Sequence, residues 1–192
     1  MRLDDATYEF IKQEVVHLFV THNVSCIPIN GFELAYKMGI RLIPYSALPV
    51  ETQIQLIEAS QDSIFLETIG QETIYFNDEM MEVNYARVNM SLLHEIGHDV
   101  LGHTGLKENE DIEETEAGFF ARYAAAPPPL VHRIQPTTAM DIELHFQLSR
   151  EAARNAFQYY QKWLHYGNPD YLDYEEKLLT LFKGDHLGGD AI

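Results

Sequence analysis

The run HEIGH at positions 94–98 constrains this chain more than any other feature of its sequence. Small or apolar residues recur around it at helical spacing, at Met90, Leu93, Gly97 and Val100. This pattern predicts a helix over residues 88–101, which Gly102 would end. Residues four apart on a helix project from the same face, so His94 and His98 should present their imidazole rings together.

Two imidazoles on one helical face can bind a single Zn²⁺ through ring nitrogens at about 2.0–2.1 Å. Glu95 is turned by about 100° around the axis, where it can act as a general base on water at the metal without ligating the ion. Zinc also polarises a carbonyl group. A five-residue pattern arises by chance in some chains, but two histidines and a glutamate are costly to bury on an apolar helix without a metal. The motif therefore predicts a zinc-dependent peptidase.

A catalytic zinc needs a third protein ligand and one position open to water. The candidates are His103, Asp99, Glu110, Glu113, Glu114 and Glu116. Acidic residues crowd the start of a second predicted helix over residues 110–126, and three prolines at 127–129 end it. A stripe of small residues on this helix comprises Ala117, Gly118, Ala121 and Ala125. Because Glu114 shares that face, a close approach of the stripe to Gly97 would bring Glu114 near both histidines.

The other candidates receive different interpretations. Glu113 is the reserve ligand, whereas Glu116 points elsewhere around the helix. Asp99 could accept the second ring N–H of a metal-bound histidine or face solvent. His103 is interpreted as a capping or surface residue. The metzincin pattern, which needs glycine and histidine three and six residues after the second histidine, is excluded because Leu101 and Thr104 occupy those positions.

The remaining patterns predict an α+β domain, mainly helical, with a small three-stranded sheet. A strand is expected at residues 40–43, and SIFLET and ETIYFN form a hairpin around Ile69, Gly70 and Gln71. Further helices are expected at residues 5–21, 51–59, 141–147 and 150–166, and between Asn30 and Gly39.

Composition limits the class of protein. The 192 residues, 46% of them apolar, predict one domain over residues 1–184 and a flexible tail at 185–192. A net charge of −17 disfavours nucleic acid or an anionic membrane as partner. The single cysteine, Cys26, is expected to be a buried apolar residue. No stretch has the length of a membrane span and the start does not look like a secretion signal, so a cytoplasmic protein is expected.

Three stretches read together resemble the ImmA/IrrE family of metallopeptidases. They are HEIGHDVLGH, the preceding IYFND with Arg87, and the following EETEAGFFARYAAAPPP. In that family the HExxH helix is followed by a helix of the form E-x-x-A-[N/D]-x-F-A that ends at proline. The core match spans about residues 74–130, and DIELHFQLSREAARNAF within residues 138–182 is similar to the family's C-terminal helices. Gly118 departs from the pattern, because it stands where the family has Asn or Asp.

The resemblance implies a zincin-like fold with Glu114 as the third zinc ligand. It also implies a protein substrate: family members of this kind cleave helix-turn-helix repressors of mobile elements, phage or stress genes, and so act as anti-repressors in transcription regulation. Such peptidases usually bind substrate extended along an edge strand beside the metal, and the predicted hairpin could supply that edge.

Two rival functions follow from the sequence. Residues 141–166 have the spacing of a DNA-binding helix-turn-helix, but Asp141, Glu143 and Glu151 leave no basic face. A catalytically inactive zinc-binding protein that sequesters a repressor is the second alternative. Glu95 disfavours it because a non-catalytic site needs no base, and structural zinc sites usually use several cysteines.

Overall fold

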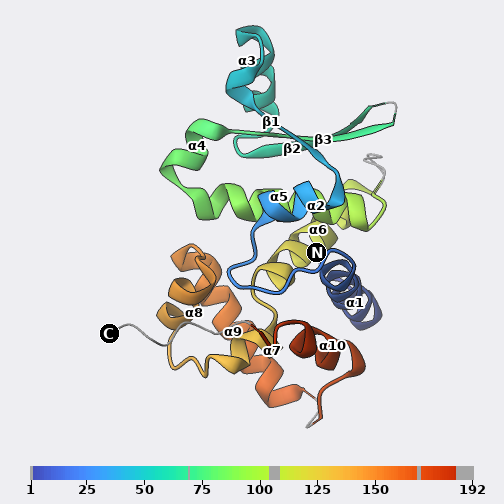
Figure 1. The fold of residues 1–192 in the computed structure, drawn as a ribbon, viewed down its shortest axis with the longest axis vertical. Coiled ribbons are helices and arrows are strands. Elements are labelled where there is room, and N and C mark those ends of the chain that lie inside the picture. Colours follow the sequence, from blue (N-terminus) through green and yellow to red (C-terminus); the bar gives the residue numbers. More distant parts are fainter. Residues whose placement is uncertain (1, 69, 104–108, 168–169, 185–192) are drawn as a thin grey trace. The chain divides into compact units, whose positions relative to one another are not determined.

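The structure is a computed structural model that describes residues 2–68, 70–103, 109–167 and 170–184. It is mostly helical and contains one three-stranded sheet, which confirms the α+β prediction (Figure 1). The residues group into two compact units, the first formed by residues 1–4 and 30–121 and the second by residues 5–29 and 122–192. One domain over residues 1–184 stays a prediction, and the predicted tail lies outside the described residues.

The sheet belongs to the first unit and has the strand order β1-β3-β2. Strand β1 (Arg41–Pro44) pairs in parallel with β3 (Gln71–Phe76), and β2 (Ser63–Thr68) pairs with β3 in antiparallel fashion. Ile74 lies in the middle of the central strand and is fully buried. This confirms the predicted strand and hairpin, and it leaves β2 at an edge of the sheet.

Short helices connect and flank these strands. The predicted helix after Asn30 is α2 (Gly31–Met38), where the Asn30 side chain caps the first turn and Gly39 ends the helix at φ 83°. The turn η1 (Tyr45–Ala47) and α3 (Val50–Ala59) follow β1, and α4 (Asp78–Val83) follows β3. Helices α3 and α5 lie on opposite sides of the sheet (Figure 1).

Helix α5 (Tyr85–Val100) carries HEIGH and packs against β2, β3 and α2. It begins three residues earlier than predicted, because the Asn84 side chain accepts a hydrogen bond from the Arg87 N–H. Its buried residues are Val88, Asn89, Leu92, Leu93, Ile96 and Gly97. The predicted apolar face was therefore partly wrong: Met90 and Val100 are only half-buried, because the sheet and α2 cover the neighbouring part of the helix surface.

Helix α6 (Glu110–Ala125) confirms the second predicted helix and spans the division between the units. It contacts α5 at the predicted glycine but through a different side chain. A methyl group added at Gly97 would lie 3.0–3.2 Å from three atoms of Phe120. The phenylalanine ring, and not the stripe of small residues, therefore fills the space that Gly97 leaves open.

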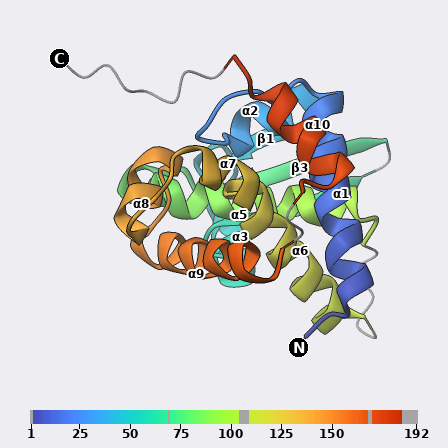
Figure 2. The same ribbon diagram turned by 90° about the horizontal axis from the view of Figure 1, so that it is seen from below.

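The regular elements described in the second unit are helices: α1 (Asp5–Thr21), α7 (Pro128–Arg133), α8 (Ala139–Phe146), α9 (Arg150–Tyr166) and α10 (Asp173–Leu181). Helices α1 and α10 lie side by side, as do α8 and α9 (Figure 2). The rings of Phe19 and Phe182 are 6.2 Å apart in the core. No helix in the described ranges has the length and apolar character needed to cross a membrane.

Cys26 was wrongly predicted to be buried, since the structure exposes it. It belongs to a segment without regular structure between α1 and α2, and its neighbours Val24 and Ile29 occupy the core positions there instead. The apolar residues on either side of Cys26 suggested burial, but this loop buries only some of them.

Candidate metal centre

Helix α5 presents the two HEIGH histidines on one face, as their spacing requires. The Nε2 atoms of His94 and His98 lie 3.0 Å apart, and their side chains are 26% and 18% exposed. Both rings therefore turn the same nitrogen toward a common point that solvent can reach.

Glu114 on α6 completes the cluster. Its Oε2 atom lies 3.2 Å from His94 Nε2, and its Oε1 atom lies 3.3 Å from His98 Nε2. Its side chain is 56% exposed. Among the described residues, His94, His98 and Glu114 form a group whose ligand atoms all lie within 4.8 Å of one another, so this group could hold a metal ion.

The chemistry and spacing of these donors fit a metal. In a tetrahedral zinc site with bonds of about 2.0–2.1 Å, ligand atoms lie about 3.3 Å apart. Here the two imidazole nitrogens lie 3.0 Å apart, and each of them lies 3.2 or 3.3 Å from a different oxygen of the Glu114 carboxylate. Burial, and then the neighbouring His94, lower the pKa of His98 to about 4, so this imidazole is neutral at pH 7 and offers a free lone pair.

Glu95 does not join the three donors but points toward the edge strand β2. Its Oε2 atom accepts a hydrogen bond from the Phe65 N–H at 3.0 Å, and its Oε1 atom accepts a longer one from the Ser63 hydroxyl at 3.4 Å. The Ser63 and Ser91 hydroxyl oxygens are 2.6 Å apart. Because Ser63 uses its single proton toward Glu95, Ser91 is the donor in that pair.

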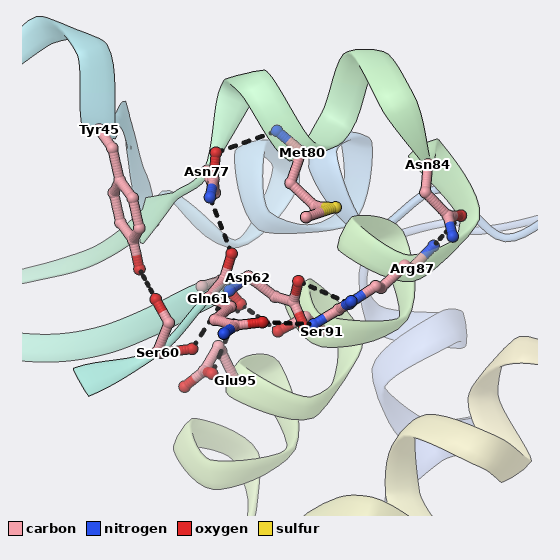
Figure 3. A network of polar contacts seen from close by, with 11 residues as sticks. Tyr45, Ser60, Gln61, Asp62, Asn77, Met80, Asn84, Arg87, Ser91 and Glu95 are labelled. Atoms are coloured by element: carbon pink, nitrogen blue, oxygen red, sulfur yellow. Dashed lines mark hydrogen bonds and ion pairs between the residues drawn. The ribbon is translucent and has the colours of Figure 1, made fainter. Parts of the chain in front are cut away.

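Further polar contacts anchor the start of β2 beside Glu95 (Figure 3). Arg87 pairs with Asp62 at 2.8 Å, and the Asn77 side chain donates to the Gln61 carbonyl at 2.9 Å. The Tyr45 hydroxyl donates to the Ser60 carbonyl at 3.2 Å. These contacts hold residues 60–62, which lead into β2 and so to the two donors that Glu95 uses.

The surroundings of Glu95 favour its protonated form. Burial is the largest effect and, with the negative charge of Glu114, raises the pKa of Glu95 to about 7 against the opposing hydrogen bonds from Phe65 and Ser63. A carboxyl group with a pKa near neutrality can both accept and return a proton at pH 7. Burial also raises the pKa of Tyr45 to about 12, and the charge of Glu95 adds to that effect.

The structure corrects the predicted surface position of His103. The His103 side chain is only 5% exposed, so it is not a surface histidine. Its Nδ1 atom lies 2.9 Å from His98 Nδ1, and its Nε2 atom lies 3.1 Å from Glu116 Oε2. Glu116 does point away from the three-donor cluster, as predicted, but it contacts His103.

The three remaining candidates, Asp99, Glu110 and Glu113, lie outside the three-donor cluster. Glu110 is exposed. Glu113 is buried at 8% exposure and Asp99 is half-buried. Their roles as reserve ligand and orienting carboxylate stay predictions.

Sequence reasoning missed Ser63, Ser91 and the Phe65 N–H. The only sequence signal for them was the position of the hairpin just before the metal helix, which does not specify which strand atoms face Glu95. Comparison of the chain with protein-family models, curated proteins and solved structures finds no match. The resemblance to ImmA/IrrE peptidases therefore stays a prediction that depends on the motifs in residues 74–130.

Proposed function

We propose that this chain is a zinc-dependent endopeptidase of zincin-like fold, with His94, His98 and Glu114 as ligands and Glu95 as general base. The observation that carries the proposal is the convergence of two imidazole nitrogens and one carboxylate within 4.8 Å, next to a carboxylate held apart from them. Three ligands leave a fourth position open, as catalytic zinc sites do, whereas structural sites are closed by four protein ligands.

Zinc, when bound, supplies a Lewis acid that polarises the scissile carbonyl and makes water more acidic. The chain supplies the proton transfers. Glu95 takes a proton from the attacking water and returns it to the leaving amine, a role that its pKa of about 7 suits. The Phe65 N–H and the Ser63 hydroxyl hold the Glu95 carboxylate in one orientation, so little reorganisation is needed when the proton moves.

Strand β2 is the element beside Glu95 that best suits a peptide substrate. It is an edge strand, and its Phe65 N–H donates to Glu95. An extended peptide can therefore add along the outer edge of β2 next to the base. Leu66, the residue after Phe65 in this strand, is 42% exposed.

The helix-turn-helix repressor substrate is supported by the sequence resemblance and by the net charge of −17, which favours a basic partner. The test incubates the purified zinc-loaded protein with repressors encoded near its gene and with a peptide library, and identifies the products by mass spectrometry. We expect internal cleavage by the wild-type protein and none by Glu95→Gln. Tight, zinc-dependent binding of a repressor without cleavage would replace the peptidase by the sequestering alternative.

A further inference from the structure

His103 is brought back onto the metal helix by the turn that ends α5. Gly102 has φ 67°, its N–H donates to the Asp99 carbonyl at 3.0 Å, and the His103 N–H donates to the His98 carbonyl at 3.0 Å. These two bonds define a Schellman motif, in which a left-handed residue lets the chain fold back over the last helical turn. The backbone hydrogen bonds of this turn alone therefore place His103 next to His98.

The side-chain contacts form a continuous chain from α6 to the metal cluster. Glu116 Oε2 lies 3.1 Å from His103 Nε2, and His103 Nδ1 lies 2.9 Å from His98 Nδ1. The opposite nitrogen of His98, Nε2, lies in the three-donor cluster with His94 and Glu114. With its side chain only 5% exposed, His103 makes both contacts largely out of water.

A metal at His98 Nε2 determines which ring nitrogens of His98 and His103 carry a proton. A neutral imidazole that uses Nε2 as a lone-pair donor carries its proton on Nδ1. His98 Nδ1–H then donates to His103 Nδ1, so the His103 proton is on Nε2, where it donates to the Glu116 carboxylate. Each contact has one donor and one acceptor, and no group has to change its charge.

We propose that His103 and Glu116 are positioning residues that orient His98 for zinc and fix its Nδ1–H tautomer. This inference rests on the proposed zinc site but not on peptidase activity. Groups that accept the free N–H of a metal-bound histidine increase its basicity, and their loss typically lowers metal affinity by about 10–100-fold. Here an uncharged imidazole lies between the ligand and the carboxylate, so the charge of Glu116 acts through His103.

The test measures zinc affinity by competition with a chromophoric chelator. We expect His103→Ala to weaken binding by about 10–100-fold. His103→Gln should recover most of this loss, because its amide oxygen can accept from His98 and its NH₂ group can donate to Glu116. Glu116→Gln should weaken binding by a smaller factor. Glu110→Gln is the matched control, since it removes the same charge from an exposed position on the same helix, and it should leave affinity unchanged.

Two further measurements separate this role from a structural one. In ¹⁵N spectra of the zinc-loaded wild-type protein, His98 should carry its proton on Nδ1 and His103 on Nε2. In the Co²⁺-substituted protein, His103→Gln should leave the visible absorption unchanged, whereas a direct ligand role for His103 would alter it and overturn the proposal.

The outcomes distinguish this proposal from the proposed function. Wild-type zinc affinity in His103→Ala and Glu116→Gln, or a proton on His103 Nδ1 in the zinc-loaded protein, would overturn the positioning role and leave the zinc site intact. Failure of the wild-type protein to bind zinc would overturn both. If His103→Ala does not fold, the Glu116→Gln affinity and the ¹⁵N spectra still decide the matter.

Discussion

Helix α5 is held on two sides by different means. On the sheet side, Glu95 receives its hydrogen bonds from Ser63 and Phe65, 32 and 30 residues earlier in the chain. At the C-terminal end, His98 is held by His103, five residues later, which in turn contacts Glu116, 13 residues further on. The proposed base thus depends on docking of a strand, whereas the proposed metal ligand depends on a local turn and the next helix. Changes on the strand side should affect chemistry, and changes at the turn should affect metal affinity.

Glu95→Gln should give the largest effect, a loss of turnover with no loss of bound zinc. Loss of a positioned general base typically costs about 10²–10⁴-fold in rate. Glutamine keeps an oxygen that can accept from the Phe65 N–H, so the local structure should be retained. Turnover of the cleaved peptide, measured beside zinc content, tests this. Loss of zinc from Glu95→Gln would show that the two sides of α5 are not separable.

The contribution of the Glu95 carboxyl to the stability of the metal-free protein should be lost as the pH rises from about 4.5 to 7, because this group binds its proton more tightly in the folded state. The lowered pKa of His98 acts in the opposite direction, so the Glu95 contribution is measured against Glu95→Gln. The folded pKa of Glu95, about 7, lies above its ordinary value of 4.5. The favourable contribution is thus complete below pH 4.5 and gone above pH 7, with a size of about 3 kcal/mol at ~1.4 kcal/mol per pH unit. Urea unfolding of the metal-free wild-type protein and Glu95→Gln, at pH 5 and 8, measures the difference. Parallel pH profiles for the two proteins would contradict the burial of Glu95.

Ser63→Ala should slow turnover by about fivefold, since one hydrogen bond contributes about 1 kcal/mol. The variant removes the hydroxyl that donates to Glu95 and accepts from Ser91, but leaves the Phe65 N–H in place. Zinc affinity should not change. Steady-state kinetics and chelator competition on the same preparation check this. Weaker zinc binding in Ser63→Ala would mean that the strand also supports the ligands.

Gly102→Ala should give the smallest effect, a small loss of stability and zinc affinity that comes from the turn after α5. No atom lies within 4 Å of an added methyl group, so the cost comes only from the left-handed backbone at φ 67°, about 1 kcal/mol. Gly102→Asn is the matched control because asparagine tolerates this conformation better. Thermal unfolding and zinc affinity of the two variants should differ in the same direction. Equal values would show that the turn does not set the position of His103.

Local signals explain what the sequence predicted well. The spacing of HEIGH, the cap at Asn30 and the stops at Gly39 and Gly102 each act within a few residues, and the structure has all of them. Helix α7 was missed because the three prolines read as the end of α6, although proline also suits the first turn of a helix.

Contacts between distant segments could not be read from the sequence. The hydrogen bond from the Phe65 N–H to Glu95 exists only because β2 docks beside α5, and no local pattern encodes that register. The predicted approach of α6 to Gly97 was right, but the contact uses Phe120, because side-chain packing decides which residue fills a gap. His103 was misread because its contact with Glu116, from another helix, cannot be seen in the sequence.

Metal content tests the central claim most directly. Elemental analysis of the purified wild-type protein, His98→Ala and Glu95→Gln, each reconstituted at neutral pH, measures the metal bound per chain. We expect one zinc per chain in the wild-type protein and in Glu95→Gln, and none in His98→Ala. A wild-type protein without stoichiometric metal, or a His98→Ala variant that retains it, would contradict a zinc site at His94, His98 and Glu114.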